Sequence, residues 1–221
     1  MRALDRIRLY RTELRVLPSV DRFFRDLARR VGPPRSEWYR DIRKALQDPA
    51  AARTLYDDRE VSALLRNTIS ITVVQAGYKT NVIPGTAEAR LDVRLLPGED
   101  PGKFLALLKA VIDDPSVEIA ADNTFRAPNE SPTDSDLFRA FEAVLGRRHP
   151  GVPVTTKLLT GATECVLYRS LGIKCYGFTP LVATPAQLGT GHGDDERIDE
   201  KTVRDSVGTF YDVVRAIAAR P

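Results

Sequence analysis

Apolar residues recur at helical spacing through roughly the first third of the chain. Two groups of helix-breaking residues, Pro18-Ser19 and Gly32-Pro33-Pro34, divide this stretch. The pattern predicts helices over residues 3–17, 21–31, 36–46 and 48–65. No Ser, Thr, Asn or Asp stands ready to cap the first helix, and this favours a chain that begins inside a longer domain.

The apolar period then changes from helical to two. Ile69, Ile71 and Val73 alternate with polar residues, which predicts a strand with one buried face. Residues 87–95 alternate in the same way, and the loop over residues 75–85 joins the two strands as a hairpin.

A helical stripe over residues 101–112 and a short strand over 117–120 follow the hairpin. The order helix, strand, strand, helix, strand is that of a ferredoxin-like α+β sandwich without its first strand. The absent strand is a second indication that the chain begins late.

A segment rich in proline, residues 126–134, separates this part from the rest of the chain. We therefore expect two domains, residues 1–126 and 127–221. In the second, the apolar pattern alternates between helix and strand, which indicates an α/β layer. The expected helices are 135–148, 164–171 and 200–219, and the expected strands are 152–159 and 173–178.

Composition narrows the possible partners and compartments. The 33 basic and 30 acidic residues are interspersed and leave a formal charge of +3, so nucleic acid is not implied as a partner. The sequence has no apolar run of membrane-spanning length and no signal-like start, so cytoplasm is the default expectation. Cys165 and Cys175 lack a CxxC spacing, which favours buried free thiols over a disulfide or a zinc site.

The strongest candidate for chemistry is His192, in the run Gly-Thr-Gly-His-Gly-Asp-Asp-Glu-Arg-Ile. Its flanking glycines permit positive φ, and the carboxylates that follow it are acceptors for an imidazole N–H of a metal-bound histidine. The alternative is an ordinary loop histidine before a helix whose first turn is acidic. The other histidine, His149, ends the predicted helix 135–148, where a surface cap is the expected role.

Two further loops carry candidate binding residues. Asn81 lies between the hairpin strands, just before Pro84-Gly85, and an amide held by a rigid turn can donate to a developing oxyanion. An asparagine that bonds its own backbone is the alternative. Gly161 and Thr163 lie in a strand-to-helix turn where ligands bind α/β sheets, although Thr163 is equally suited to cap the helix.

The motifs Asn-Val-Ile-Pro, Asp-Val-Arg-Leu-Leu-Pro-Gly, Thr-Gly-Ala-Thr-Glu and His-Gly-Asp-Asp-Glu-Arg-Ile occur in this order. Together they resemble the M20 family of metallopeptidases and aminoacylases from about residue 68 onward. The resemblance implies a two-zinc α/β catalytic domain that carries an inserted ferredoxin-like lid, often a dimerisation domain. It also implies hydrolysis of an amide bond in a peptide or an N-acyl amino acid by a metal-activated water.

The resemblance assigns a role to each candidate residue. His192 matches the last metal ligand of the family, and Asn81 matches a lid asparagine that contacts the substrate carbonyl or carboxylate. Arg94 matches the lid arginine that binds the substrate carboxylate, and Gly161 and Thr163 match a turn on the substrate side. The resemblance also implies a homodimer formed through the lid.

The departures from the family pattern limit what the chain can do alone. The other zinc ligands of the family, a His-x-Asp pair, a bridging Asp and a further Glu, have no counterpart here. Because each catalytic zinc needs at least three protein ligands, we expect this chain to bind zinc weakly and to be inactive by itself. Glu164 and Val166 replace the Asp and Arg usual in the turn, which leaves Arg94 as the better carboxylate-binding candidate. The alternative is a non-enzymatic dimerisation or small-ligand module.

Overall fold

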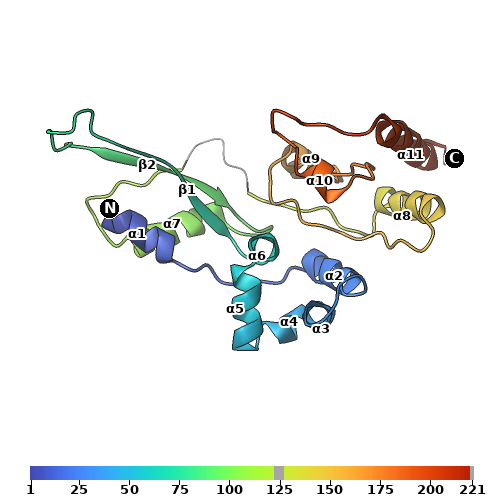
Figure 1. Cartoon of the computed structure of the whole chain (residues 1–221), viewed down its shortest axis with the longest axis horizontal. Coiled ribbons are helices and arrows are strands. Elements are labelled where there is room, and N and C mark those ends of the chain that lie inside the picture. The colour runs from blue at the N-terminus through green and yellow to red at the C-terminus, as the bar shows by residue number, and fades with distance from the viewer. Residues whose placement is uncertain (122–126, 220–221) are drawn as a thin grey trace. The chain divides into compact units, whose positions relative to one another are not determined.

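The computed structural model describes residues 1–121 and 127–219, and these fall into two compact units (Figure 1). The first unit contains Met1–Glu130 and Thr156–Leu171, and the second contains Ser131–Thr155 and Gly172–Pro221. The fold class is mixed helix and strand, as the sequence predicts. The proposed domains, residues 1–126 and 127–221, stay a prediction.

A cluster of short helices forms one end of the first unit. Its members are α2 (Pro18–Leu27), α3 (Arg35–Arg40), α4 (Ile42–Ala45), α5 (Pro49–Asp57) and α6 (Arg59–Leu65). Their apolar faces meet in a core where Phe24, Ile42 and Leu65 are fully buried. The ring of Phe24 lies 4.8 Å from that of Tyr39, so aromatic packing links α2 to α3.

Local capping explains where these helices begin. The side chain of Asp48 accepts hydrogen bonds from the first-turn amides of α5, and Asp58 does the same for α6. The helix predicted over residues 3–17 ends at Leu9, and the next helix begins at Pro18 instead of residue 21, because proline is tolerated at a first-turn position that needs no amide donor. The predicted helix 48–65 is divided in two because Asp58 ends one helix and caps the next.

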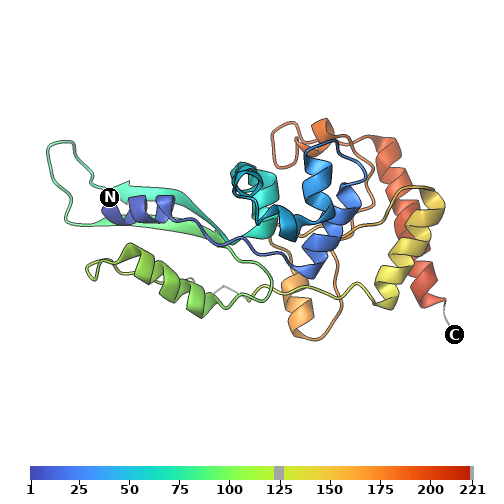
Figure 2. The same ribbon diagram turned by 90° about the horizontal axis from the view of Figure 1, so that it is seen from below.

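The hairpin consists of β1 (Thr68–Ala76) and β2 (Ala87–Arg94), which pair antiparallel with an irregularity between Ile71 and Val73. The helices α1 (Arg2–Leu9) and α7 (Pro101–Ile112) contact each other beside this ribbon, as Figures 1 and 2 show. Asp100 caps α7 by accepting from the amides of Gly102 and Lys103. This helix lies where the sequence predicts it.

The strands predicted over residues 117–120, 152–159 and 173–178 are not strands in the structure. Among the described residues the only sheet is the β1–β2 pair. In a ferredoxin-like sheet the first strand lies between the third and the fourth. Residues 117–120 correspond to the fourth strand, and no described segment occupies the position between them and β2. Residues 117–120 therefore have the alternating pattern of a strand but do not pair with another strand.

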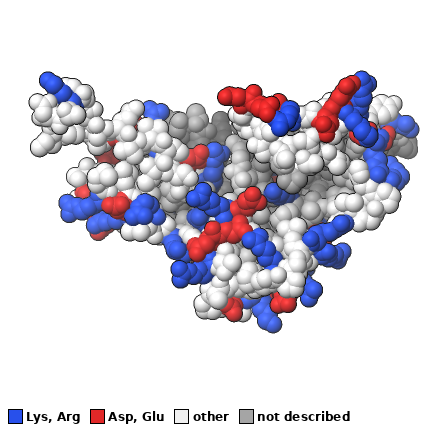
Figure 3. Space-filling view, in the orientation of Figure 1, with Lys and Arg blue, Asp and Glu red and all other residues white. Residues whose placement is uncertain are grey.

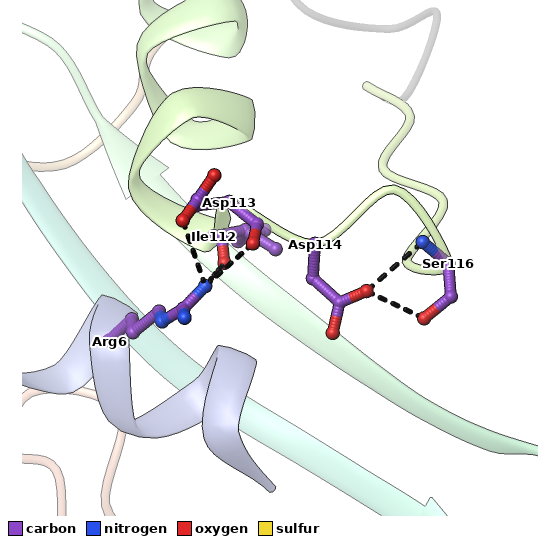
Figure 4. A network of polar contacts seen from close by, with 5 residues as sticks. All are labelled: Arg6, Ile112, Asp113, Asp114 and Ser116. Carbon is purple, nitrogen blue, oxygen red and sulfur yellow. Dashed lines mark hydrogen bonds and ion pairs between the residues drawn. The ribbon is translucent and has the colours of Figure 1, made fainter.

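Arg6 ties α1 to the carboxyl end of α7 (Figure 4). Its guanidinium donates to the backbone carbonyls of Ile112 and Asp113, the latter at 2.8 Å, and lies 3.8 Å from the Asp113 carboxylate. A cation that binds the last carbonyls of a helix satisfies acceptors that have no partner within the helix. Beside it, hydrogen bonds from Ser116 lower the pKa of Asp114 from its ordinary value.

We expect Arg6→Met to destabilise the chain by about 1 kcal/mol, because the lost donors leave the α7 carbonyls to solvent. Urea denaturation followed by circular dichroism measures this change. Arg8→Met is the matched control, since the described structure pairs Arg8 with Asp5 of its own helix, at 3.5 Å between exposed side chains. Equal effects of the two substitutions would show that the contact with α7 contributes nothing.

The second unit is built on α8 (Asp136–Arg148) and α11 (Glu200–Ala218), which lie side by side in Figures 1 and 2. Phe138, Phe141 and Val144 of α8 form its core with Val213 of α11. Arg148 binds the Asp212 carboxylate through two donors, at 2.9 and 2.6 Å. This unit also contains the short helix α10 (Pro185–Leu188), whereas α9 (Cys165–Ser170) lies in the first unit.

Two observations concern partners and compartment. In the described residues no helix is both long enough and apolar enough to span a bilayer. Basic and acidic side chains are interspersed over the face shown in Figure 3, as their order in the sequence predicts.

The expectation of free thiols is wrong, because Cys165 and Cys175 are both disulfide-bonded. Spacing in the sequence carried no information about where the two sulfur atoms lie.

Candidate functional site

His192 lies in a tight, exposed turn that its neighbours hold by backbone hydrogen bonds. Gly193 N–H donates to the Thr190 carbonyl at 3.0 Å, and Arg197 N–H donates to the Thr190 hydroxyl at 3.3 Å. A Cβ added to Gly193 would come within 3.2 Å of that same carbonyl. A larger residue at 193 would therefore make a tight contact with the backbone.

The residue with positive φ in this turn is His192 itself, at 64°, and neither flanking glycine has it. Left-handed backbone is uncommon for residues other than glycine, and it occurs most often where the surrounding structure or a function demands it. The expectation that the glycines would supply positive φ is therefore wrong. The observed conformation instead fixes the direction of the imidazole-bearing residue.

The carboxylates after His192 stabilise the turn and do not contact the imidazole. Glu196 accepts from the His192 backbone N–H at 3.1 Å, and Asp195 forms an ion pair with Arg197. Among the described residues, the His192 ring has no hydrogen-bond partner. Both ring nitrogens are thus available to a ligand, although the expected support from the carboxylates is absent.

The described residues contain no group of three His, Cys, Asp or Glu side chains placed to hold a metal ion. A catalytic zinc needs at least three protein ligands with one open position. The donors present in this chain therefore do not fit a complete metal centre, and His192 can contribute one ligand to it at most.

Arg94 ends β2 with its guanidinium fork occupied by Asp92. Its Nε and a terminal nitrogen donate to the two Asp92 carboxylate oxygens at 2.6 and 2.7 Å. These hydrogen bonds and the negative charge of Asp92 raise the pKa of Arg94 above its ordinary value. The two residues are neighbours on one face of β2, a pairing that the strand period already indicates. The fork thus has the geometry for a carboxylate, and Asp92 fills it.

Asn81 lies in the exposed loop that joins β1 to β2. Its side chain makes no hydrogen bond within the described chain, so it does not form the local turn that was the alternative reading. The loop is closed by Pro84, whose Cβ would lie 3.7 Å from a Cβ on Gly77, a residue with φ of 71°. The amide of Asn81 is therefore presented to solvent on a stem that proline stiffens.

Asn81 and Arg94 stand at opposite ends of the hairpin. β2 begins at Ala87 and ends at Arg94, and a strand of this length spans about 25 Å. A peptide end or an N-acyl amino acid is much shorter than that. The structure therefore does not place Asn81 and Arg94 of one chain on the same small substrate.

Gly161 and Thr163 precede α9 in the first unit. The Thr163 hydroxyl accepts from the Cys165 N–H at 3.3 Å, at the first residue of α9, while Glu164 holds the cap position without a side-chain hydrogen bond. Gly161 has no positive φ, and an added Cβ would meet only the Leu159 side chain, at 3.9 Å. The local geometry requires neither residue for ligand binding. His149 likewise closes α8, with its N–H on the Leu145 carbonyl at 2.8 Å.

Part of the first unit matches a known protein-family model. Residues 24–120 match the family model described as a peptidase dimerisation domain. A solved M20 metallo-carboxypeptidase from Sulfolobus solfataricus superposes with a TM-score of 0.52 and 18% identity, over 97% of this chain and 50% of that one. The superposition supports the same fold.

Curated relatives extend the similarity beyond the dimerisation domain. A probable carboxypeptidase S-like 2 from Dictyostelium discoideum is 29% identical over 171 residues, which are 77% of this chain and 33% of that protein. The N-fatty-acyl-amino acid synthase/hydrolase PM20D1 from Xenopus tropicalis is 28% identical over the same shares. Human aminoacylase-1 is 27% identical over 70% of this chain and 38% of its own length.

The chain thus spans between a third and two fifths of the length of these relatives. The similarity to hydrolases of the M20 type covers most of the chain, although the individual site residues stay predictions. The resemblance to the M20 family is thereby confirmed: residues 24–120 match its peptidase dimerisation domain, and at least 70% of the chain is similar in sequence to M20-type peptidases and aminoacylases.

Proposed function

We propose that this chain forms the carboxyl-terminal part of a metal-dependent amide hydrolase that acts on peptides or N-acyl amino acids. The observation that carries the proposal is the match to a carboxypeptidase-like protein, an acyl-amino-acid hydrolase and an aminoacylase over at least 70% of this chain. The names of all three describe chemistry at an amide bond beside an amino acid.

The metal proposed is zinc, with His192 as one ligand and the others contributed by sequence that this chain does not contain. Zinc bound in an enzyme lowers the pKa of its water to about 7 and polarises the amide carbonyl. In this chain His192 would hold one coordination position, and Arg94 would orient the substrate through its carboxylate. The isolated chain is inactive in this proposal, because one ligand cannot hold a catalytic ion.

The proposal is tested by joining the chain to an M20 segment that carries the His-x-Asp and Glu-Glu motifs. Release of amino acid from N-acetyl amino acids and from dipeptides is measured with zinc present, and the isolated chain is the control. We expect hydrolysis by the joined protein only. A joined protein that is folded and loaded with zinc but hydrolyses neither substrate would contradict the proposal.

A homodimer through the hairpin is the second part of the proposal. The dimerisation-domain match covers this hairpin, whose two strands have no further strand beside them in the described chain. Val74, Tyr78 and Ile83 are exposed by 54%, 86% and 94%. An open strand edge, with exposed apolar side chains on β1 and on the loop that follows it, is suited to contact with a second copy. It would also let Asn81 act in the site of the partner, given its distance from Arg94.

We expect a dimer by light scattering at tens of micromolar, and a shift to monomer in Val74→Lys, because lysine opposes pairing at a strand edge. Val182→Lys is the control, since Val182 is 68% exposed in the other unit. If the wild-type chain is a monomer, the proposed homodimer is wrong. The alternative of a non-enzymatic dimerisation module is then wrong as well. Equal dissociation by both substitutions would assign the effect to charge alone.

A further inference from the structure

A cavity lined mostly by arginines lies where α2 contacts α3 in the first unit (Figure 1). Its volume is about 340 Å³, and the residues that line it are Arg25, Ala28, Arg29 and Arg40. Arg25 belongs to α2, Arg29 lies in the turn that follows this helix, and Arg40 is the last residue of α3. We call Arg25, Arg29 and Arg40 the arginine cluster.

Each member of the arginine cluster directly follows a residue of the hydrophobic core. The preceding residues are Phe24, Ala28 and Tyr39, which are exposed by 0%, 6% and 2%. The rings of Phe24 and Tyr39 lie 4.8 Å apart and pack α2 against α3. The backbone that carries the three arginines is therefore fixed by the core, and this lowers the entropy cost of binding a ligand.

Arg25 is the member of the arginine cluster that already has a counter-ion. Its guanidinium donates to the Asp21 carboxylate, and this hydrogen bond, together with the charges of Asp21, Asp41 and Asp26, raises the pKa of Arg25. Asp26 forms an ion pair within α2 at 3.9 Å, and Asp41 caps α4 by accepting from a first-turn amide at 3.0 Å. These two carboxylates are thus engaged in contacts outside the cavity.

Arg29 and Arg40 make no hydrogen bond or ion pair with any residue that the structure describes. Arg25 and Arg29 are four residues apart, and like charges at this spacing repel each other on a helix surface. A cation near the carboxyl end of a helix is favourable by itself, which accounts for one arginine at the end of each helix. It does not account for three at one cavity, where a bound anion would offset their repulsion.

We propose that the arginine cluster binds the phosphoryl group of a phosphate monoester. Such a group has three terminal oxygens and carries about −1.5 to −2 charges at pH 7. Each guanidinium presents a planar pair of donors that fits two of these oxygens. Three such forks match one phosphoryl group, whereas a carboxylate has only two oxygens and leaves donors of the arginine cluster without an acceptor.

The size of the cavity favours an ester over inorganic phosphate. Sites for small molecules have volumes of about 300–1,000 Å³, and this cavity lies at the lower end of that range. It therefore has room for a phosphoryl group and for the small organic group attached to it. None of His192, Asn81 and Arg94 lines the cavity, so this proposal does not depend on the proposed amide hydrolysis.

The test measures binding of glycerol 3-phosphate to the whole chain by isothermal titration calorimetry at constant ionic strength. We expect saturable binding, with acetate and inorganic phosphate both weaker. Arg29→Gln and Arg40→Gln should each raise Kd at least about tenfold, because each removes a charge-assisted pair of donors. Arg53→Gln is the matched control, since it removes the same charge from a side chain of α5 that is 80% exposed, and its Kd should not change. Circular dichroism checks that each variant retains its helix content.

Two further variants give results that a loss of folding cannot imitate. Asp21 occupies the donors of Arg25, so Asp21→Asn should free them and lower Kd for glycerol 3-phosphate by up to about fivefold. Arg40→Lys keeps the charge but not the planar fork, so its Kd should lie close to that of Arg40→Gln. A Kd of Arg40→Lys equal to that of the wild type would show that the cavity attracts anions by charge alone and would overturn the proposal.

Three other results would overturn the proposal as well. They are no saturable binding of a phosphate monoester, equal binding of acetate, and equal Kd values for Arg29→Gln and Arg53→Gln. Phosphatidic acid carries the same phosphate monoester in a lipid, so vesicles of phosphatidylcholine with and without it form a second arm. Binding that requires phosphatidic acid, exceeds that of glycerol 3-phosphate and is lost in Arg40→Gln would confirm the site and identify its ester as a lipid headgroup.

Discussion

His192→Ala should lower kcat/KM of the enzyme restored with its metal-binding segment by at least about 100-fold, which corresponds to about 2.7 kcal/mol of lost transition-state stabilisation. The reason is the loss of one protein ligand from a centre that needs at least three around each zinc. The metal content after dialysis should fall together with the activity. Stability of the chain should change little, because His192 is exposed and its ring has no partner among the described residues.

His149→Ala is the internal control for this substitution. His149 follows α8, and its backbone N–H, which alanine retains, makes the contact with Leu145. We expect unchanged metal content and activity in this variant. Full metal content and turnover after His192→Ala would show that the turn over residues 189–197 is an ordinary loop. The assignment of His192 as a ligand would then be wrong.

The helices show what local sequence can predict. The starts of α7 and α8 follow from Asp100 and Ser135, whose side chains accept the first-turn amides. Their ends lie within one residue of the prediction. Both features depend on neighbours in sequence, so the chain carries the information locally. The start of α2 at Pro18 was mispredicted because proline is tolerated in the first turn of a helix but breaks the helix interior.

The strands show what local sequence cannot predict. Residues 117–120 and 173–178 have the same alternation as β1, yet only β1 has a ladder. Alternation reports which side chains can share a buried face, whereas a ladder requires a second strand at hydrogen-bonding distance. The sequence reports the first condition for each segment. The second depends on where other segments lie in space, which the alternation of one segment does not report.

In the candidate site, too, the sequence predicts some features and not others. The sequence identifies the turn around His192, but it does not show that the left-handed residue is the histidine or that Glu196 binds its backbone. The separation of Asn81 from Arg94 follows once the hairpin register is known.

Arg94→Lys should lower kcat/KM of the restored enzyme by about 10- to 100-fold for substrates with a free carboxylate. A lysine keeps the charge but cannot reproduce the planar pair of donors that Arg94 presents, as shown by its two bonds to Asp92. The loss should appear in KM where the carboxylate is bound equally in the ground and transition states. A substrate whose carboxylate is replaced by an amide should be hydrolysed equally by both proteins.

Asp92→Asn decides between a binding site and a structural pair. Asp92 fills the fork at present, so a substrate carboxylate must displace it. An exposed pair of this kind is worth only about 0.2–1 kcal/mol, which a bidentate substrate contact can offset. If Arg94 binds substrate, removal of the competing charge should lower KM up to about fivefold, which is the same free energy expressed as a ratio. If Arg94 only pairs with Asp92, neither Asp92→Asn nor Arg94→Lys should alter turnover. Unchanged kinetics in both variants would therefore remove Arg94 from the site and leave Asn81 as the candidate substrate contact on the hairpin.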